Sequence, residues 1–326
     1  MPQYNLSELL KNAGLTMVKD DRLLAGIGDD SAVIKISEKL AIIQTIDVFT
    51  PIIDDPVIQG NICACNVLND IYTMGWPDPL SMVSLIAYPL EMPEKIATGM
   101  LKGFYEFCEK DGCLIVGGQT IQNPWPLLGG CAIAVADPNK LVYLNGSKEG
   151  DILLLTKPLG IQPAMAAYRL LKEPKLMKEI FELISQKEME KAIEIAVKIM
   201  TTSNKPVAKV TQEIPINAAT DVTGFGLKGH AGEMAKQSNI DIIIEKLPII
   251  KGTKELAETF GYLLLKGEAA ETAGGMLISV SKDNLENLIN LLKRNGVDPY
   301  VIGKVTHGTG KVNINENIEI IECQKS

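Results

Sequence analysis

The sequence contains few of the residues on which several common kinds of site depend. Its 326 residues include only two histidines, which leaves little material for a histidine-rich zinc site or for paired histidine chemistry. It also has only three arginines, Arg22, Arg169 and Arg294. Because guanidinium groups are the usual partners of phosphates and carboxylates, any anionic ligand here must have much of its charge neutralised by other cations.

Basic blocks and long apolar runs are also absent. The formal net charge is −8 and lysines and arginines do not cluster, so we expect no nucleic-acid partner, since a phosphate backbone requires such a surface. No run of about 18 apolar residues occurs, so we expect no membrane partner. The first residues, MPQYNLSELLKNAG, lack the basic and then apolar layout of a signal peptide. We therefore expect a cytoplasmic protein.

The six cysteines form no C-x-x-C pair and no paired spacing typical of a metal site. Two of them lie in the apolar stretch ICAC, which has helical character, and small buried cysteines are common in such stretches. We interpret these two as packing residues. With little histidine and no paired cysteines, any catalysis is expected to depend on carboxylates and metal ions. The cysteines are Cys63, Cys65, Cys108, Cys113, Cys131 and Cys323.

Strand-like and helix-like segments alternate in the first half of the chain. Residues 41–49 are apolar and β-branched, as in a buried strand. Asp55 is a suitable N-cap and Pro56 a suitable first helical residue. The pattern therefore predicts a helix of about four to five turns that stops at Gly75.

A turn-rich stretch at 137–151 divides the chain. We place a domain boundary there and expect two domains, 1–148 and 149–326. The second domain opens with a strand and continues through long helices. Residues 175–200 carry apolar positions at helical spacing with many lysines and glutamates, which predicts a long helix with a solvated face. The order of elements is mixed α and β, without tandem repeats.

Five aspartates occupy positions where a carboxylate needs a partner. Asp29 and Asp30 are adjacent in GIGDDSAV, and both an Asp-rich turn and a divalent-cation site explain such a pair. Asp47 lies in an apolar strand, Asp70 on the predicted helix, and Asp221 between a small-residue strand and a Gly-rich helix start. Each alone fits an N-cap, a turn or a satisfied buried group. Together they favour a hard cation such as Mg²⁺, which commonly binds substrate phosphates.

Glycines supply the second part of the pattern. Gly117 and Gly118 are expected to end a strand, where backbone amides can approach an oxyanion closely. Gly224 and Gly226 are expected where a helix begins and its amides are free. Neither segment is a P-loop or a dinucleotide fingerprint. The residues alone therefore predict a metal-dependent nucleotide or phosphate enzyme and leave its reaction open.

Seven segments together resemble one family, the selenophosphate synthetases (selenide, water dikinases), within the aminoimidazole ribonucleotide synthetase superfamily. The resemblance runs from about residue 26 to the C-terminus. Cousins that make purine, thiamine and hydrogenase-cofactor intermediates share a GDD-like loop, but two segments, TIDVFTPIIDDP and GGQTIQNPWP, are more similar to the selenophosphate branch. The matching segments are GIGDDSAV, QTIDVFTPIIDDP, NVLNDIYTMG, VGGQTIQNPWPLLGG, GDILLLTKPLG, AATDVTGFGLKGH and ETAGGMLISV.

The resemblance implies a two-domain α+β fold. Its N-terminal domain would be a mixed sheet with helices that binds ATP and metal and pairs with a second copy in a homodimer. Its C-terminal domain would be an α/β sandwich that completes the nucleotide site.

The resemblance also implies a reaction and a set of site residues. The family makes selenophosphate, AMP and orthophosphate from ATP, selenide and water, with Mg²⁺ and a monovalent cation, here K⁺. Asp29 is expected to be a further metal ligand or a neighbour of the ligands. The implied Mg²⁺ ligands are Asp30, Asp70 and Asp221, and the implied nucleotide-binding residues are Thr45, Asp47, Gly117, Gly118, Gln119 and Thr120.

One part of the family pattern has no match here. Family members carry, ahead of the matching region, a Gly-rich segment with a reactive cysteine or selenocysteine and a nearby lysine. No cysteine precedes Cys63, and the nearest lysine, Lys11, matches no part of that motif. We therefore assign no catalytic residue within the chain and expect the Cys or Sec and the lysine to lie upstream of Met1. A start downstream of a UGA codon read as a stop, a deliberately shortened chain and a natural paralogue all explain the difference.

We accordingly expect the chain as given to bind Mg-ATP with little selenide-dependent turnover. Two other functions stay open. One is a non-catalytic or regulatory ATP-binding subunit, and the other is an ATP-using enzyme of the superfamily that acts on a sulfur or amide substrate.

Overall fold

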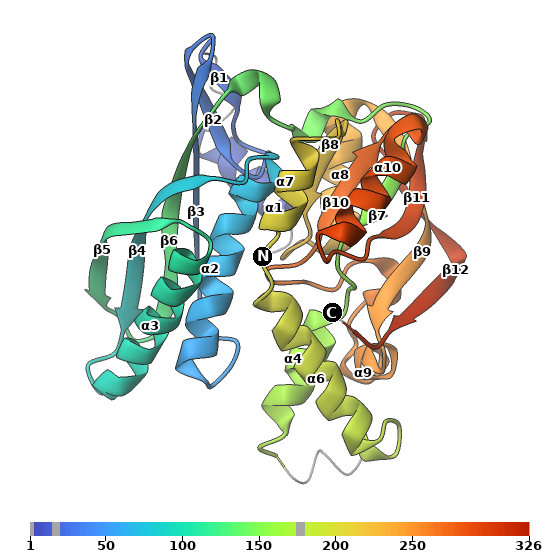
Figure 1. Cartoon of the computed structure of the whole chain (residues 1–326). Helices are drawn as coiled ribbons and strands as arrows, with labels where there is room; N and C mark the ends of the chain where they lie inside the picture. Colours follow the sequence, from blue (N-terminus) through green and yellow to red (C-terminus); the bar gives the residue numbers. More distant parts are fainter. Residues whose placement is uncertain (1–2, 15–19, 174–179, 326) are drawn as a thin grey trace.

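The chain folds into two six-stranded sheets that lie side by side, with helices between and around them (Figure 1). The computed structural model describes residues 3–14, 20–173 and 180–325. Strands up to residue 136 form the first sheet, and strands from residue 152 form the second. The architecture is α+β with two mixed sheets, as predicted.

The first sheet has the strand order β1-β2-β3-β6-β4-β5, and its pairs are antiparallel except β4 with β5. Helices α2 and α3 pack on one face of this sheet and leave the other face open (Figure 1). Alternation along β3 turns Ile43 and Thr45 toward the helices and Ile46 toward the open face. The elements are β1 (Leu23–Ala25), β2 (Ala32–Ser37), β3 (Leu40–Phe49), α2 (Pro56–Thr73), β4 (Pro79–Tyr88), α3 (Glu94–Lys110), β5 (Leu114–Gln122) and β6 (Leu127–Ala136).

Helix α2 begins where the sequence predicts. The carboxylate of Asp55 accepts hydrogen bonds from two backbone N–H groups of the first turn, at 2.9 and 3.0 Å, and Pro56 occupies the first helical position. Gly103 of α3 lies against this turn, because a Cβ there would be 1.9 Å from the carbonyl oxygen of Val57. Only glycine allows the two helices to approach this closely.

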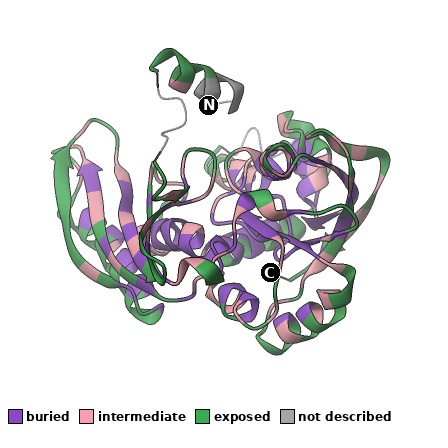
Figure 2. Cartoon of the chain, turned by 90° about the horizontal axis from the view of Figure 1, so that it is seen from above, coloured by how far each residue is buried: buried purple, intermediate pink, exposed green. Residues whose placement is uncertain are grey.

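Helix α2 is also the element that joins the two halves of the molecule. It packs on β3 and β6 of the first sheet and on β8, α6 and α7 of the second half. Most of its residues are therefore buried, and Figure 2 shows buried residues concentrated between the two sheets. Cys63 and Cys65 are fully buried in this helix, as expected of packing residues.

The second sheet has the strand order β12-β9-β11-β7-β10-β8, with only β12 and β9 parallel. Its strands are β7 (Ile152–Leu155), β8 (Ala218–Asp221), β9 (Ile240–Ile250), β10 (Met276–Val280), β11 (Tyr300–His307) and β12 (Val312–Cys323). The remaining described helices are α1 (Gln3–Asn12), α4 (Ile161–Leu170), α6 (Gln186–Met200), α7 (Lys205–Thr211), α8 (Gly226–Ser238), α9 (Thr253–Phe260) and α10 (Lys282–Arg294), with 3-10 turns η1 (Pro138–Lys140), η2 (Leu144–Gly146) and η3 (Leu264–Lys266).

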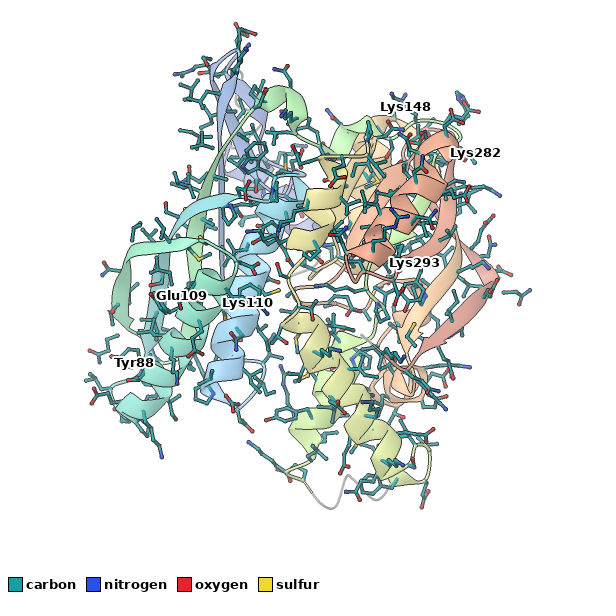
Figure 3. The ribbon with its side chains drawn as sticks, viewed as in Figure 1. Tyr88, Glu109, Lys110, Lys148, Lys282 and Lys293 are labelled. Atoms are coloured by element: carbon teal, nitrogen blue, oxygen red, sulfur yellow. The ribbon has the colours of Figure 1, made fainter. Side chains whose placement is uncertain are left out.

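Helices cover both faces of the second sheet. Leu153 and Leu277 pack with α8 and α9 on one face, while their neighbours Leu154 and Ile278 pack with α7 and α10 on the other. The outer surface is charged; Figure 3 shows Lys282 of α10, for example, at the rim of the molecule. The second half is thus an α/β sandwich, as the resemblance implied.

The prediction of one long helix at 175–200 is wrong for the part of this segment that the structure describes. Residues 174–179 lie outside the described residues, and residues 182–185 are not helical. Helix α6 begins only at Gln186, after Ser185, whose hydroxyl accepts the N–H of Glu188 at 3.3 Å and donates to its carboxylate at 2.8 Å. This side-chain N-cap starts a new helix, and the apolar periodicity concealed it.

Candidate metal and nucleotide site

The three aspartates predicted as metal ligands come together between the two sheets. Asp30 lies in the turn before β2, Asp70 on α2, and Asp221 at the end of β8. Oxygens of Asp30 and Asp221 and a ring nitrogen of His230 lie within 4.8 Å of one another. Asp70 adjoins them, since burial and then the charges of neighbouring aspartates, including Asp221 and Asp30, raise the pKa of its carboxyl. We call Asp30, Asp70 and Asp221 the carboxylate cluster.

Burial and mutual repulsion make the cluster costly in its charged form. Burial raises the pKa of Asp221 to about 7 and that of Asp47, which lies beside the cluster, to about 6. It raises the pKa values of Asp30 and Asp70 well above the ordinary aspartate value, and the neighbouring carboxylates add to this rise. One oxygen of Asp30 and one of Asp221 are buried without a hydrogen-bond partner among the described residues. Unpartnered carboxylate oxygens of this kind fit a hard divalent cation such as Mg²⁺.

Hydroxyl groups orient the carboxylates of the cluster. The hydroxyl of Thr45 on β3 donates to a carboxylate oxygen of Asp70, and that of Thr220 donates to Asp30 at 2.9 Å. The hydroxyls of Ser31 and Thr73 bind the backbone carbonyl of Asp70 at 3.1 and 2.8 Å. The cluster is therefore held in place by residues of both halves of the chain.

Asp47 is held by a neighbour on α2. The side-chain amide of Asn66 donates to its carboxylate at 2.7 Å, and the amide oxygen of Asn66 accepts the backbone N–H of Ala273 at 2.7 Å. Asp47 therefore reaches the second half of the chain through one side chain. The sequence placed Asp47 in a strand but gave no sign of this link.

The two adjacent aspartates have different surroundings. Both oxygens of Asp29 accept backbone N–H groups, from Asp30 at 2.9 Å and from Leu144 at 3.4 Å. This is the turn chemistry that an Asp-rich loop predicts. Asp30 instead points its unpartnered oxygen into the cluster. A further role of Asp29 as a metal ligand stays a prediction.

His230 is a site residue that the sequence analysis missed. The backbone N–H of Thr223 donates to its Nε2 at 3.1 Å, and its Nδ1 lies 3.4 Å from the hydroxyl of Thr220. Burial lowers the pKa of His230 to about 4, so the ring is neutral, with the proton on Nδ1. Because Nε2 is already an acceptor, His230 supports Thr220 and through it Asp30. Its place after DVTGFG was the only available signal.

One cavity opens beside the cluster, and a larger one lies next to it along α8. One of about 270 Å³ is lined by Asp30, Thr220 and His230 among others, and one of about 710 Å³ runs along α8; they share Phe225. Helix α8 begins at Gly226, as predicted, with a positive φ of 67°. A Cβ at this glycine would lie 2.7 Å from two carbonyl oxygens, so glycine is required where the helix starts. The smaller cavity provides room for a ligand next to Asp30.

The glycine-rich segment that the resemblance implies for nucleotide binding lies apart from the cluster within one chain. Residues 117–120 do not end a strand as predicted; they lie inside β5, which continues to Gln122 at the exposed edge of the first sheet. Asp47 pairs with Gly130, Gly130 with Ser84, and Ser84 with Gly118. Three strand spacings thus separate Asp47 from Gly118, roughly 14 Å. The prediction that the strand ends at these glycines was wrong, because the pairing of β5 with β4 continues through Gln122.

Comparison with protein families identifies the class that this fold and site define. Residues 28–136 match the N-terminal domain of AIR synthase related proteins, and residues 148–315 match their C-terminal domain. The structure superposes on AaThiL complexed with AMPPCP and TMP with a TM-score of 0.72 and 20% sequence identity, covering 97% of this chain and 94% of that one. At this identity the likeness shows the fold.

Proteins similar in sequence identify the family within this class. The chain is 42% identical to a selenide, water dikinase of Methanococcus maripaludis, over 99% of this chain and 97% of the relative. It is 43% identical to a selenide, water dikinase of Methanocaldococcus jannaschii, over 93% of this chain and 88% of the relative. The chain therefore belongs to the selenide, water dikinase family, as the seven sequence segments implied.

Among the described helices, none combines the length and the apolar character that a membrane crossing requires.

Proposed function

We propose that this chain binds Mg-ATP for the reaction of its family, the synthesis of selenophosphate from ATP, selenide and water, with release of AMP and orthophosphate. The observation that carries the proposal is the carboxylate cluster with its two unpartnered oxygens, in a chain 42% identical to a selenide, water dikinase. The expectation that turnover is weak without an upstream Cys or Sec stays a prediction.

Asp30, Asp70 and Asp221 are the residues that would hold Mg²⁺. Bound there, Mg²⁺ would neutralise charge on the phosphoryl groups of ATP. The protein's own contribution is orientation: Thr45 and Thr220 fix two of the carboxylates before any cation arrives. The same hydrogen bonds favour the charged form of both carboxylates, but burial and the neighbouring aspartates outweigh them and raise both pKa values, so a bound cation would be needed to stabilise the charged form.

For the nucleotide we propose contacts with Thr45 and Asp47 from β3 and with Gly117, Gly118, Gln119 and Thr120 from β5. Asp47 is supported by Asn66, and its carboxylate lies beside the cluster. The backbone of β5 at these glycines is exposed and pairs on one side only, so its N–H groups are accessible to a ligand. K⁺ is proposed as a second cation on the basis of the family resemblance.

We also propose that the chain forms a homodimer through the open face of the first sheet. Ile46, Val83, Ile121 and Val135 are exposed apolar residues spread over that face, and Ile46 is 66% exposed. No helix of the described chain packs on it. A second copy would bury this surface, which is otherwise unfavourable in water. Such pairing would also give the exposed segment 117–120 a second wall.

The proposed domain division falls after residue 148, between the last strand of the first sheet and β7. It is supported by the separate sheets, and it assigns the carboxylate cluster to both domains, since Asp221 alone comes from the second. The location in the cytoplasm stays a prediction.

Phosphorus NMR of ATP with Mg²⁺, K⁺ and selenide tests the reaction. It is run on this chain, on Asp221→Asn, on the exposed control Asp283→Asn, and on a form extended upstream through any Cys or Sec codon. Selenophosphate and AMP from the wild type or the extended form, but not from Asp221→Asn, support the proposal. ATP binding by every form without selenophosphate overturns the reaction, and loss of Mg-dependent ATP binding from all of them overturns the proposal as a whole.

A further inference from the structure

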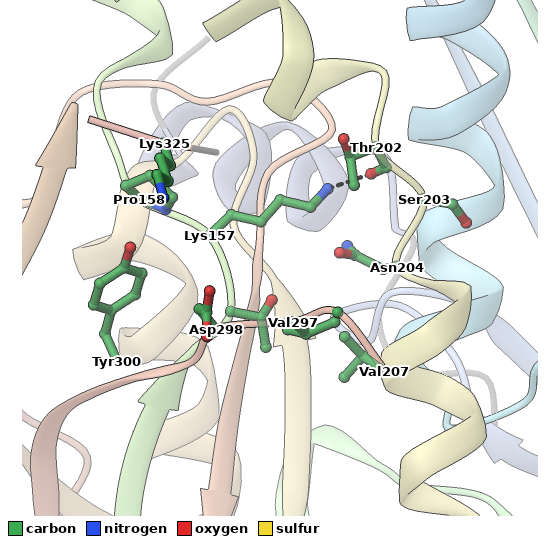
Figure 4. A pocket seen from close by; sticks show the side chains of 12 residues that line it. Lys157, Pro158, Thr202, Ser203, Asn204, Val207, Val297, Asp298, Tyr300 and Lys325 are labelled. Atoms are coloured by element: carbon green, nitrogen blue, oxygen red, sulfur yellow. Dashed lines mark hydrogen bonds between the residues drawn. The ribbon is translucent and has the colours of Figure 1, made fainter. Parts of the chain in front are cut away.

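A buried lysine lies between the two domains and has no role so far. Lys157 follows β7 and is 7% exposed. Its Nζ donates to the backbone carbonyl oxygens of Thr202 at 2.6 Å, Ala273 at 3.1 Å and Ile199 at 3.3 Å. Figure 4 shows the side chain extending toward Thr202 beside a cavity of about 70 Å³. Among the described residues, no carboxylate forms an ion pair with it.

The three acceptors determine the charge of this group. Backbone carbonyls only accept hydrogen bonds, so three of them require three N–H donors, and a neutral amine has two. The group is therefore an ammonium ion. Ile199 lies in the last turn of α6 and Thr202 two residues after its end, where a positive charge is favoured; the carbonyl of Ile199 also accepts the N–H of Thr202 at 3.2 Å. A ring of carbonyl oxygens around a monovalent cation is also how proteins replace the hydration shell of K⁺.

The third carbonyl connects Lys157 to the site. Ala273 has a left-handed backbone, with φ of 47°, which a residue other than glycine adopts only when its surroundings hold it. Its N–H donates to Asn66, the residue that orients Asp47. We call residues 273–275 the Ala273 segment.

The Ala273 segment is held along its whole length. The amide of Asn204 donates to the carbonyl of Gly274 at 3.0 Å, and the N–H of Val222, next to Asp221, donates to the carbonyl of Gly275 at 2.9 Å. The segment therefore lies between Asn66 with Asp47 on one side and Asp221 on the other.

We propose that Lys157 is a tethered monovalent cation whose ammonium fills a cage of three carbonyls and fixes the Ala273 segment, and that it is thereby a positioning residue for Asp47 and Asp221. Its consequence for ATP rests on the proposed function, while the cage itself does not. Lys157→Ala is expected to empty the cage and to remove the ammonium donor from all three carbonyls, of which that of Ala273 has no other hydrogen bond among the described residues. A small cation from solution can then take the place of the ammonium, whereas tetramethylammonium is too large.

The test compares melting temperatures in about 0.2 M KCl, NH₄Cl and tetramethylammonium chloride for the wild type, Lys157→Ala, Lys157→Met and the exposed control Lys282→Ala. We expect Lys157→Ala to melt about 5 °C below the wild type in tetramethylammonium and to regain about 3 °C in K⁺ or NH₄⁺. Lys157→Met fills the cage with an apolar side chain. Its melting temperature should therefore rise no more than that of the wild type when K⁺ or NH₄⁺ replaces tetramethylammonium. If the melting temperatures of Lys157→Ala and the wild type change equally between these salts, the proposed carbonyl cage is refuted.

A second readout separates positioning from folding. Compared with the wild type in the same salt, Lys157→Ala is expected to have a Kd for Mg-ATP about tenfold higher in tetramethylammonium and a similar Kd in K⁺. An unchanged Kd overturns the positioning role, and a wild type that binds no ATP overturns the proposed function while the melting comparison still decides the cage. If Lys157→Ala does not fold, lysine ¹⁵N NMR of the wild type decides instead: a slowly exchanging NH₃⁺ signal supports the cage, and its absence refutes it.

Discussion

Replacing Asp221 by asparagine is expected to stabilise the protein in the absence of metal and to abolish its stabilisation by Mg²⁺. The carboxyl of Asp221 is buried, and burial followed by the charge of Asp47 raises its pKa from 3.8 to about 7. Because the pKa is higher in the folded than in the unfolded chain, the stability that this group contributes is present below about pH 4 and is lost as the pH rises through about 7. Above that range the wild type carries the full cost of a buried charge.

The size of the effect follows from the same pKa. The rise from 3.8 to about 7 corresponds to about 4 kcal/mol, at about 1.4 kcal/mol for each pH unit. With about 2.1 cal/mol/K of unfolding entropy per residue, a chain of 326 residues shifts its melting temperature by about 1.5 °C per kcal/mol. The expected gain for metal-free Asp221→Asn is therefore about 6 °C at pH 8 and close to zero at pH 4.

Thermal unfolding with a chelator at pH 4 and pH 8, and with Mg²⁺ at pH 8, measures both parts of this prediction. Asp283→Asn, an exposed carboxylate on α10, serves as the control and should match the wild type throughout. Mg²⁺ should raise the melting temperature of the wild type and the control but not of Asp221→Asn. If metal-free Asp221→Asn is less stable than the wild type at pH 8, the cost of the buried charge has been misjudged and the argument for a cation site is refuted.

Three further outcomes follow from named contacts. Asn66→Leu removes both the donor to Asp47 and the acceptor of a backbone N–H, so calorimetry should show Mg-ATP binding weakened about tenfold; unchanged affinity would contradict this. Ile46→Asp places a charge on the open face of the first sheet and should convert a dimer to monomers in sedimentation velocity, with persistence of the dimer counting against the proposed interface. Gly103→Ala puts a Cβ 1.9 Å from a carbonyl of α2 and should cost about 3 kcal/mol in urea unfolding, whereas Gly232→Ala, with nothing within 4 Å, should gain about 0.5–1 kcal/mol; equal effects would refute the close helix approach.

The elements that the sequence predicts well are those with local causes. Asp55 and Pro56 start α2 through hydrogen bonds and backbone angles that involve only their neighbours, and the start was read correctly. The prediction of one helix at 175–200 was wrong because two local signals compete there. The N-cap at Ser185 starts a new helix although the apolar residues continue at helical spacing. Residue pattern alone ranks such signals poorly, since burial decides between them.

The candidate site was predictable as a set of residue types more than as an arrangement. Acidic groups in or beside apolar elements indicated a cation site, the family resemblance implied Asp30, Asp70 and Asp221 as its ligands, and the fold brings these three together. Lys157 and His230 gave no comparable signal, because a single lysine or histidine acquires its role from contacts made by distant segments. Tertiary structure alone supplies those contacts.

The aspartates of the carboxylate cluster are anchored unequally, and this bears on how fast the proposed site would exchange a cation. Asp70 belongs to α2, which both halves of the molecule bury, so it can be displaced only by an opening that costs nearly the whole stability of the fold. Asp30 lies in a short turn after the three-residue β1, held by Thr220 and by a 2.6 Å hydrogen bond from Gln237 to the carbonyl of Gly28. For the proposed cation, the helix would therefore determine the binding position, and opening of the turn would determine the residence time.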